Sequence, residues 1–288
     1  MANTQPMEDR ITYSRIISVK NIAQKHITFI FQSYTMSQLV VLAYSGGLDT
    51  SYCVKYFLAQ GKTVHSVIVN TGGFSQKELQ EIEARAYSLG VTKHVTIDET
   101  ADYYAQCIKY LVFGNVLKNN TYPLSVSAER VFQSLAIARY AKEVKADFVA
   151  HGSTGAGNDQ VRFDAAFTVL IPNIPIITPI RDNRLSREEE IEFLKQHGVN
   201  QDWTKAQYSI NKGLWGTTVG GKETLTSDQY LPESAFPTQL SKTNPEEITL
   251  HFTQGELTGV NGVTMPPVEA IQKVAEIAQP FAIGRDIH

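Results

Sequence analysis

Short apolar runs alternate along this chain with longer segments in which apolar residues recur at helical spacing. The run at 39–42 is entirely apolar, as expected for a strand buried on both faces. Runs of this kind predict the other strands, and the amphipathic segments between them predict helices. The further strands are expected at 64–70, 94–98 and 147–150, and the helices at 52–59, 75–89, 100–113 and 127–145. This alternation predicts βαβ units and a parallel sheet, so the predicted fold class is α/β.

Capping residues and glycines mark several helix ends. The helix at 75–89 is followed by Gly90, and a charged helix at 186–197 has Ser186 as its cap and Gly198 after it. In the helix at 127–145, the spacing predicts a set of inward-facing residues. These are Val131, Leu135, Ala136, Ala138 and Tyr140.

The composition changes from residue 200 onward, where glycine and threonine are frequent and prolines recur at Pro232, Pro237 and Pro245. The segment 247–252 alternates as a strand does, and 255–260 is expected to return antiparallel to it. Residues 267–277 predict a short helix.

The first 36 residues stand apart from this pattern. Their apolar run at 27–31 is far too short to span a bilayer, and no small-residue cleavage site follows it. Met36 lies just ahead of Ser37, Gln38 and the first strand, where the folded part of the chain would naturally begin. We therefore expect 1–36 to be an N-terminal extension, of which 1–35 are dispensable. Peptides from 1–35 in mass spectrometry of the native protein would count against this.

The net charge and the two cysteines bear on which classes of function are expected. The 288 residues carry a formal net charge of −3, so no global basic field indicates nucleic-acid binding. Cys53 and Cys107 lie far apart and lack metal-ligand spacing. Buried free thiols in a reducing cytoplasm are the expected state.

A glycine-rich turn follows the first strand. Its nine residues, 43–51, read Ala-Tyr-Ser-Gly-Gly-Leu-Asp-Thr-Ser and lead into a helix. Adjacent glycines let the backbone approach a ligand, and a helix N-terminus attracts anions. The P-loop pattern Gly-x-x-x-x-Gly-Lys-Ser/Thr is absent. The motif instead resembles the pyrophosphate loop of ATP-pyrophosphatases, which cleave ATP between the α and β phosphates. The alternative is a turn whose serine and aspartate only cap the helix.

A second glycine loop follows the strand at 147–150. Residues 151–163 read His-Gly-Ser-Thr-Gly-Ala-Gly-Asn-Asp-Gln-Val-Arg-Phe. The third glycine of a dinucleotide fingerprint is missing, so an NAD site is not supported. Dense polar residues beside a buried strand are costly unless a ligand or a network satisfies them. The alternative is a polar turn that caps the next element. We interpret His151 as a satisfied strand-end histidine and not as a catalyst.

With both loops in view, the chain resembles the argininosuccinate synthase family over residues 37–288. The two loops match that family's signatures, and Tyr122 and Ser127 resemble its citrulline-binding tyrosine and serine. The segment 208–216 resembles its Trp-Ser-x-Asp-x-Asn-Leu-Trp-Gly stretch, and Thr218 falls where a further citrulline-contacting hydroxyl is expected.

The resemblance implies ATP-dependent condensation of citrulline with aspartate through a citrullyl-AMP intermediate, with release of AMP and pyrophosphate. It also implies a nucleotide-binding domain at 37–202, Rossmann-like and related to adenine nucleotide alpha hydrolases, followed by part of an α+β synthetase domain at 203–288. ATP and Mg²⁺ are the implied cofactors. No nucleic-acid or membrane partner is expected.

The resemblance also assigns the site residue by residue. ATP would contact Ala43, Tyr44, Ser45, Gly46, Gly47, Leu48, Asp49, Thr50, Ser51, Val69, Gly152, Gly155 and Gly157. Citrulline would contact Tyr122, Ser127, Asn158, Arg162, Ser209 and Thr218. Aspartate would contact Thr154, Asn158 and Asp159, with Asp159 receiving its ammonium group and Arg162 holding the citrulline carboxylate as a fork. Ser45, Asp49 and Asp159 are the predicted catalytic residues. Separately, Tyr122 could instead be a core aromatic, and Ser209 or Thr218 a turn hydroxyl.

Some positions depart from the family pattern. Ala156 stands where a lysine is frequent, and Glu129-Arg130 replaces the more usual Ala-Arg. Asn211 and Gly213 stand in place of Asp and Asn.

Members of the family continue for more than a hundred residues past the match to His288, and they form homotetramers with a long C-terminal helix. For this chain we therefore expect weaker citrulline binding and impaired tetramer formation. Two other functions stay open at this stage. One is a different pyrophosphate-loop ligase or a tRNA-thiolating enzyme, and the other is a homologue that binds ATP without turnover.

Overall fold

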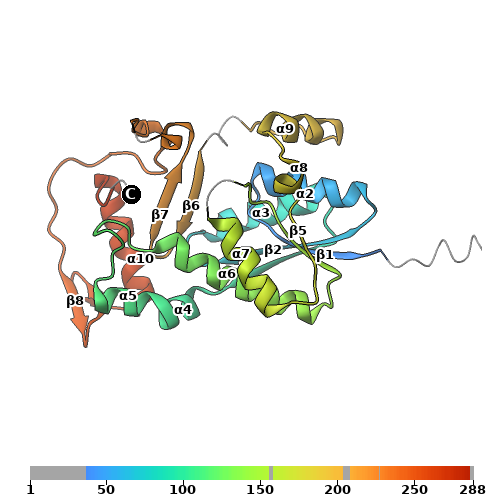
Figure 1. Cartoon of the computed structure of the whole chain (residues 1–288). Helices are drawn as coiled ribbons and strands as arrows, with labels where there is room; N and C mark the ends of the chain where they lie inside the picture. The colour runs from blue at the N-terminus through green and yellow to red at the C-terminus, as the bar shows by residue number, and fades with distance from the viewer. Residues whose placement is uncertain (1–36, 156–157, 204–207, 227, 286–288) are drawn as a thin grey trace, which may run out of the picture. The chain divides into compact units, whose positions relative to one another are not determined.

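A computed structural model describes residues 37–285, apart from 156–157, 204–207 and 227. All four predicted strands are present in one parallel sheet, which gains a fifth strand at its edge (Figure 1). The order is β3-β2-β1-β4-β5, and each neighbouring pair is parallel. The strands are Leu39–Ala43 (β1), Thr63–Asn70 (β2), Lys93–Asp98 (β3), Phe148–His151 (β4) and Ile176–Ile177 (β5). The predicted α/β class is thus confirmed.

Both faces of this sheet are buried, as the apolar run of β1 predicts. Val40 and Leu42 contribute to the apolar core on one face, whereas Val41 points into the core on the other. All three are fully buried. Alternation along a strand sends neighbouring side chains to opposite faces, so a central strand needs apolar residues throughout.

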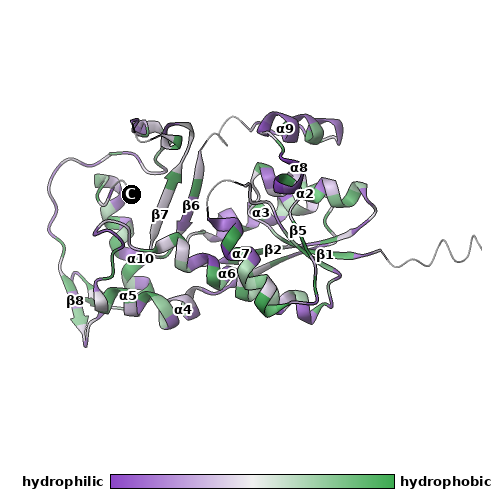
Figure 2. Cartoon of the chain, viewed as in Figure 1, coloured by the Kyte–Doolittle hydropathy of each residue, from purple (hydrophilic) through white to green (hydrophobic). Residues whose placement is uncertain are grey.

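Helices cover the two faces. One face packs against α2 (Leu48–Ala59), α3 (Gln76–Leu89), α8 (Pro179–Asn183) and α9 (Arg187–Gln196). The other packs against α6 (Ser125–Glu143) and α7 (Asp159–Leu170). Figure 2 shows the strands of the sheet as largely hydrophobic and the outer helix α9 as largely hydrophilic.

Serine caps begin two of these helices as predicted. The Ser75 side chain accepts a hydrogen bond from the Glu78 N–H, and the Glu78 carboxylate accepts one from the Ser75 N–H in return. Ser186 and Glu189 form the same capping box at α9. Gly90 ends α3 in the left-handed conformation, with φ of 101°. Such caps satisfy backbone groups that the helix leaves free.

Two helix predictions need correction. Helix α2 begins at Leu48, four residues before the predicted start, so the second half of the glycine-rich motif forms its first turn. Helix α6 begins at Ser125, and its inward face includes Phe132 and Ile137. Val131 was predicted to face inward, but it is 46% exposed. A neighbouring position lies about 100° around the helix, so a small error in choosing the apolar face turns such a residue outward.

The predicted helix at 100–113 is interrupted by a π-helical segment. It consists of α4 (Thr100–Tyr103), the π segment η1 (Tyr104–Ile108) and α5 (Lys109–Gly114). Its buried residues, among them Tyr103 and Ile108, form a separate small core with Phe132 of α6.

An antiparallel hairpin packs over the carboxyl end of β2. Its strands are β6 (Ser209–Gly213) and β7 (Gly216–Gly220). The N–H of Leu214, in the turn, donates to the carbonyl of Thr71 at 3.0 Å. Lys212 Nζ lies 3.1 Å from Glu78 Oε1. The hairpin therefore contacts the rest of the fold at two points, directly after β2 and in the first turn of α3.

A three-stranded antiparallel sheet, in the order β10-β9-β8, ends the described chain. It comprises β8 (Leu250–Thr253), β9 (Glu256–Val260) and β10 (Val263–Thr264), followed by α10 (Pro267–Ala278). Short 3-10 turns lie at η3 (Lys222–Leu225), η4 (Glu233–Ala235) and η5 (Gln279–Phe281). The prediction that 255–260 returns antiparallel is confirmed.

The predicted start of the strand at residue 247 is wrong. Leu250 already pairs with Val260, the last residue of β9, so no partner strand remains for the three residues before it. Among the residues that the structure describes, no helix is both long and apolar enough to cross a membrane.

Candidate active site

The two glycine loops meet where the strand order of the sheet reverses. Strands β2 and β3 lie on one side of β1, and β4 and β5 lie on its other side. Ala43 at the end of β1 is in register with His151 at the end of β4. Ligands of open α/β sheets bind outside the carboxyl ends of strands at such a switch point. The fold therefore places both loops at the expected binding position.

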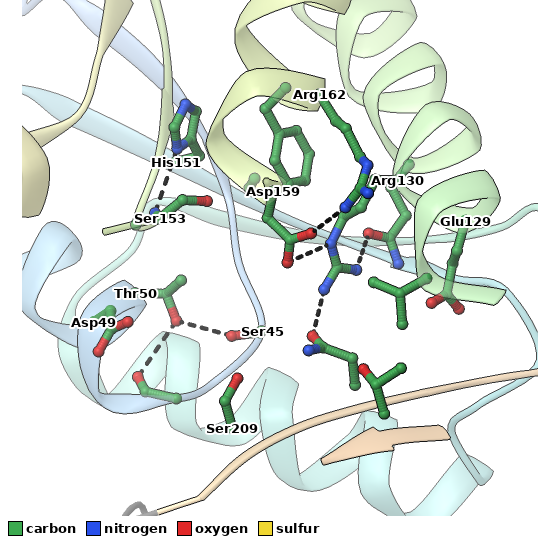
Figure 3. Close-up of a pocket in the computed structure, with 18 of the residues that line it drawn as sticks. Ser45, Asp49, Thr50, Glu129, Arg130, His151, Ser153, Asp159, Arg162 and Ser209 are labelled. Atoms are coloured by element: carbon green, nitrogen blue, oxygen red, sulfur yellow. Dashed lines mark hydrogen bonds and ion pairs between the residues drawn. The ribbon is translucent and has the colours of Figure 1, made fainter. Parts of the chain in front are cut away.

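A cavity of about 910 Å³ opens at this position (Figure 3). Its walls come from the two loops, from α6 and α7, and from the β6–β7 hairpin. Sixteen of the residues predicted for the site line it. They are Ala43, Tyr44, Ser45, Gly47, Leu48, Asp49, Thr50, Val69, Tyr122, Gly152, Thr154, Asn158, Asp159, Arg162, Ser209 and Thr218.

Four other predicted residues do not line the cavity. Gly46, Ser51, Ser127 and Gly155 lie outside its wall, and Gly157 lies outside the described residues. Ser51 is fully buried, and its hydroxyl donates to the Gly47 carbonyl at 2.7 Å. Ser51 therefore supports the loop from behind.

The first loop presents hydroxyls and a free helix end. The N-cap of α2 is Gly47, and no side chain caps this helix. The reading that its serine and aspartate only cap the helix is therefore not supported. Ser45 Oγ lies 3.4 Å from Thr50 Oγ1. Gly46 has φ of 76°, a conformation that favours glycine. An uncapped helix N-terminus with two hydroxyls beside it can bind phosphate.

Behind the first loop, Asp49 is hydrogen-bonded to Glu190 of α9. Burial raises the pKa of Asp49, although Arg187 opposes this. Burial, and then the Asp49 carboxylate, raise the pKa of Glu190 to about 8. The two carboxyls therefore hold one proton between them at neutral pH. Sequence analysis did not find this partner, because Glu190 belongs to a charged helix whose pattern predicts a solvated face.

The second loop packs directly on the first. A Cβ at Gly152 would lie 3.2 Å from the carbonyl carbon of Asp49 and 3.2 Å from Cγ2 of Thr50. The two loops approach each other so closely here that glycine, which has no Cβ, is favoured directly after β4.

His151 is a satisfied histidine, as predicted. Its Nε2 lies 2.9 Å from Asp164 Oδ1, and its Nδ1 accepts a hydrogen bond from the Ser153 N–H at 3.3 Å. These partners place the ring proton on Nε2. Burial lowers the pKa of His151. The neutral ring therefore fixes the strand end.

The carboxylate of Asp159 lies between two guanidinium groups. Arg130 Nε is 3.1 Å from its Oδ2, and Arg162 Nη1 is 3.0 Å from its Oδ1. Arg130 also donates to Gln133 at 2.7 Å and to Asn211 of the hairpin. Sequence reasoning gave Arg130 no role. The signal that could have found it is its place three residues after Ser127, a predicted citrulline residue in the first turn of α6.

Tyr122 and Ser127 form a small unit at the start of α6. The Ser127 N–H donates to the Tyr122 hydroxyl at 3.2 Å, and the Ser127 hydroxyl donates to the Leu124 carbonyl at 3.1 Å. Tyr122 itself lines the cavity, whereas Ser127 orients it. Neither Cys53 nor Cys107 belongs to the wall, and Cys53 is fully buried.

A doubly wound parallel sheet, with a Ser-Gly-Gly-x-Asp loop that opens a helix at its switch point, defines a nucleotide-binding α/β protein of the pyrophosphate-loop class. Residues 39–200 match the family model described as the arginosuccinate synthase N-terminal HUP domain. This chain belongs to the argininosuccinate synthase family.

Individual relatives agree with this assignment. The chain is 38% identical over 254 residues to the argininosuccinate synthase of Methanocaldococcus jannaschii, which covers 87% of this chain and 64% of that protein. It is 37% identical over 251 residues to that of Sulfurisphaera tokodaii, with 86% and 64% covered. It is 35% identical over 258 residues to that of Leuconostoc citreum, with 88% and 63% covered. The chain thus spans a little under two thirds of the length of these curated relatives.

Proposed function

We propose that this chain carries out the argininosuccinate synthase reaction, the ATP-dependent condensation of citrulline with aspartate. The observation that carries the proposal is one cavity whose wall joins the pyrophosphate loop to the Asp159–Arg162 pair and to the hydroxyls of Ser209 and Thr218. The names of the relatives support it. They also favour it over the other pyrophosphate-loop functions considered from the sequence.

The nucleotide would occupy the end of the cavity beside α2. Its β and γ phosphates would meet the uncapped N-terminus of this helix, together with the hydroxyls of Ser45 and Thr50. The backbone of Val69 and of Gly152 would contact the rest of ATP.

Mg²⁺ would enter with ATP. Within the described ranges no group of three or more metal-ligating side chains exists. Asp49, which lines the cavity, is the loop's carboxylate and would face the ion. A single carboxylate fits a cation that is held mainly by phosphate oxygens. When bound, the ion would neutralise the departing pyrophosphate.

The amino acids would occupy the end formed by α6, α7 and the hairpin. The ureido oxygen of citrulline attacks the α-phosphate, and the bond to the pyrophosphate oxygen breaks. The aspartate amine then attacks the activated carbon, loses a proton and expels AMP. No protein nucleophile takes part, so catalysis rests on positioning and on stabilising charge. In this scheme Arg162 holds the citrulline carboxylate, and Thr154, Asn158 and Asp159 hold aspartate.

The domain division at 202/203, the cytoplasmic location and a homotetramer in the full-length family belong to the same proposal. They rest on the resemblance of the motifs and on the family assignment.

Pyrophosphate release tests the proposal. The 288-residue chain is incubated with Mg·ATP, with and without citrulline and aspartate. We expect release that requires citrulline, and argininosuccinate in the mass spectrum when aspartate is added. ATP binding without citrulline-dependent release would contradict the proposal and would favour a homologue that binds ATP without turnover.

A further inference from the structure

Glu129 of α6 is a buried carboxyl to which the proposed reaction gives no role. It is 2% exposed, and it belongs to the wall of the cavity (Figure 3). The hydroxyl of Thr71, directly after β2, donates to its Oε1. Within the described part of the chain, no donor is hydrogen-bonded to Oε2. One carboxyl oxygen in the cavity wall is therefore available to a ligand.

Gly213 of the hairpin makes room for this carboxyl. A Cβ placed at Gly213 would collide with Oε1 of Glu129, so a larger residue there would displace the glutamate. The two residues therefore form one unit, in which the carboxyl fills the space that a side chain at position 213 would need.

When the Glu129 carboxyl is ionised, the groups around it do not balance its negative charge. The charged and titratable groups facing it are Arg130 on its own helix, Asp159 of α7 and Tyr103 of α4. Arg130 is already engaged by Asp159. Burial raises the pKa of Glu129 to about 7, whereas Thr71 and Arg130 oppose the rise. A buried carboxylate is costly without a cation beside it, so a cationic group of a ligand would be favoured there.

The position of Glu129 favours one of the substrates. It lies two residues beyond Ser127, and both Glu129 and Tyr122 lie close to Tyr103. Glu129 therefore belongs to the end of the cavity that is predicted to bind citrulline. ATP carries no ammonium group. The ammonium group of aspartate already has a carboxylate partner in the scheme above, Asp159 of α7. The α-ammonium of citrulline takes no part in the chemistry and is free to be held.

We propose that Glu129 is a specificity-determining residue that binds the α-ammonium group of the ureido amino acid. This inference rests on the proposed function.

The test compares two ligands and two variants of the full chain. The ligands are citrulline and 5-ureidopentanoate, which has the same ureido and carboxylate groups but no ammonium. Glu129→Gln keeps the shape and the acceptor for Thr71 but removes the charge. Glu99→Gln is the matched control, since Glu99 is 6% exposed and lies outside the cavity wall. Binding is measured by calorimetry, KM by pyrophosphate release, and folding by thermal melting.

We expect Glu129→Gln to weaken citrulline binding and to raise its KM by about 10- to 100-fold, the loss typical of a charged hydrogen bond. The KM for ATP and the affinity for 5-ureidopentanoate stay unchanged, and Glu99→Gln behaves as the wild type. Citrulline affinity of the wild type rises between pH 6 and pH 8, whereas that of Glu129→Gln does not.

Equal citrulline affinity in wild type and Glu129→Gln, or an equal loss for both ligands, would overturn the inference. If Glu129→Gln does not fold, the wild type alone still tests the inference. Equal affinity of the wild type for citrulline and 5-ureidopentanoate would overturn it. If citrulline-dependent release is intact while Glu129→Gln has no effect, this inference alone fails. A wild type that neither binds citrulline nor releases pyrophosphate refutes the proposed function too.

Discussion

Nε of Arg130 lies 3.1 Å from Oδ2 of Asp159, an ion pair that ties α6 to α7 at the wall of the cavity. Arg162 occupies the other oxygen of the same carboxylate at 3.0 Å. Two guanidinium groups share this one carboxylate, so one of them can bind a carboxylate of a substrate instead. Since Arg162 is exposed to the cavity, a substrate carboxylate can take it while Arg130 keeps Asp159 paired.

Replacing Arg130 with lysine tests this arrangement. Lysine keeps the charge but is a point donor, so it cannot reach Asp159, Gln133 and Asn211 together. We expect kcat/KM for argininosuccinate formation to fall about 10- to 100-fold, measured by coupled pyrophosphate release. Arg184→Lys is the control, because Arg184 is exposed and outside the cavity wall. Full activity in Arg130→Lys would show that charge alone suffices.

Gly152 offers a test of the contact between the two loops. A methyl group there would press on the backbone of Asp49 and on Thr50, at 3.2 Å from each. Over-packing of this kind costs about 1–3 kcal/mol, so Gly152→Ala is expected to weaken ATP binding about 10-fold or more. Gly220→Ala is the matched control, since a Cβ there meets only Thr224 Oγ1 at 3.7 Å. Fluorescent nucleotide titration of both variants measures the difference, and equal affinities would mean that the loops do not need this close approach.

Glu129 predicts a pH dependence of stability. Its pKa is about 7 in the folded chain, against an ordinary value of 4.5. A carboxyl whose pKa is raised by folding contributes stability below its unfolded pKa and loses it as the pH rises through the folded one. Between pH 4.5 and pH 8 the wild type should therefore lose roughly 3 kcal/mol of unfolding free energy that Glu129→Gln keeps. Urea unfolding of both proteins at several pH values gives this difference. Parallel curves for the two proteins would contradict it.

The two loops could be predicted because their residues are consecutive in sequence. Strand, glycines and helix follow each other in each case, so local pattern alone places Ser45 in the loop after one strand and Asp159 in the segment after another. Parallel pairing then brings the two loops together, as the register of Ala43 with His151 confirms.

The supporting residues could not be predicted in this way. Three glutamates follow one another at 188–190, yet Glu188 is exposed, Glu189 caps the helix, and Glu190 is 1% exposed beside Asp49. Only the docking angle of α9 on α2 decides which of them turns inward. The environment of Glu129 likewise depends on the hairpin that packs against it. Gly213 of this hairpin lies 84 positions further along the chain.

The Asp49–Glu190 pair predicts an alkaline limit. At neutral pH Glu190, with a pKa of about 8, is protonated and donates its proton to Asp49. As the pH rises through about 8 this proton is lost, and the carboxylates of Glu190 and Asp49 then repel each other behind the pyrophosphate loop. The wild type should accordingly lose pyrophosphate-releasing activity, and some thermal stability, above pH 8.

Glu190→Gln isolates this effect. The amide N–H₂ can donate to Asp49 as the protonated acid does, but it cannot ionise. At pH 7 the variant should match the wild type in melting temperature, and above pH 8 it should retain activity that the wild type loses. Glu190→Leu supplies no donor, and it is expected to lower activity at every pH because Asp49 loses its partner. If Glu190→Gln shows the same alkaline decline as the wild type, the ionisation that limits the reaction belongs to another group, and Glu190 only packs against the loop.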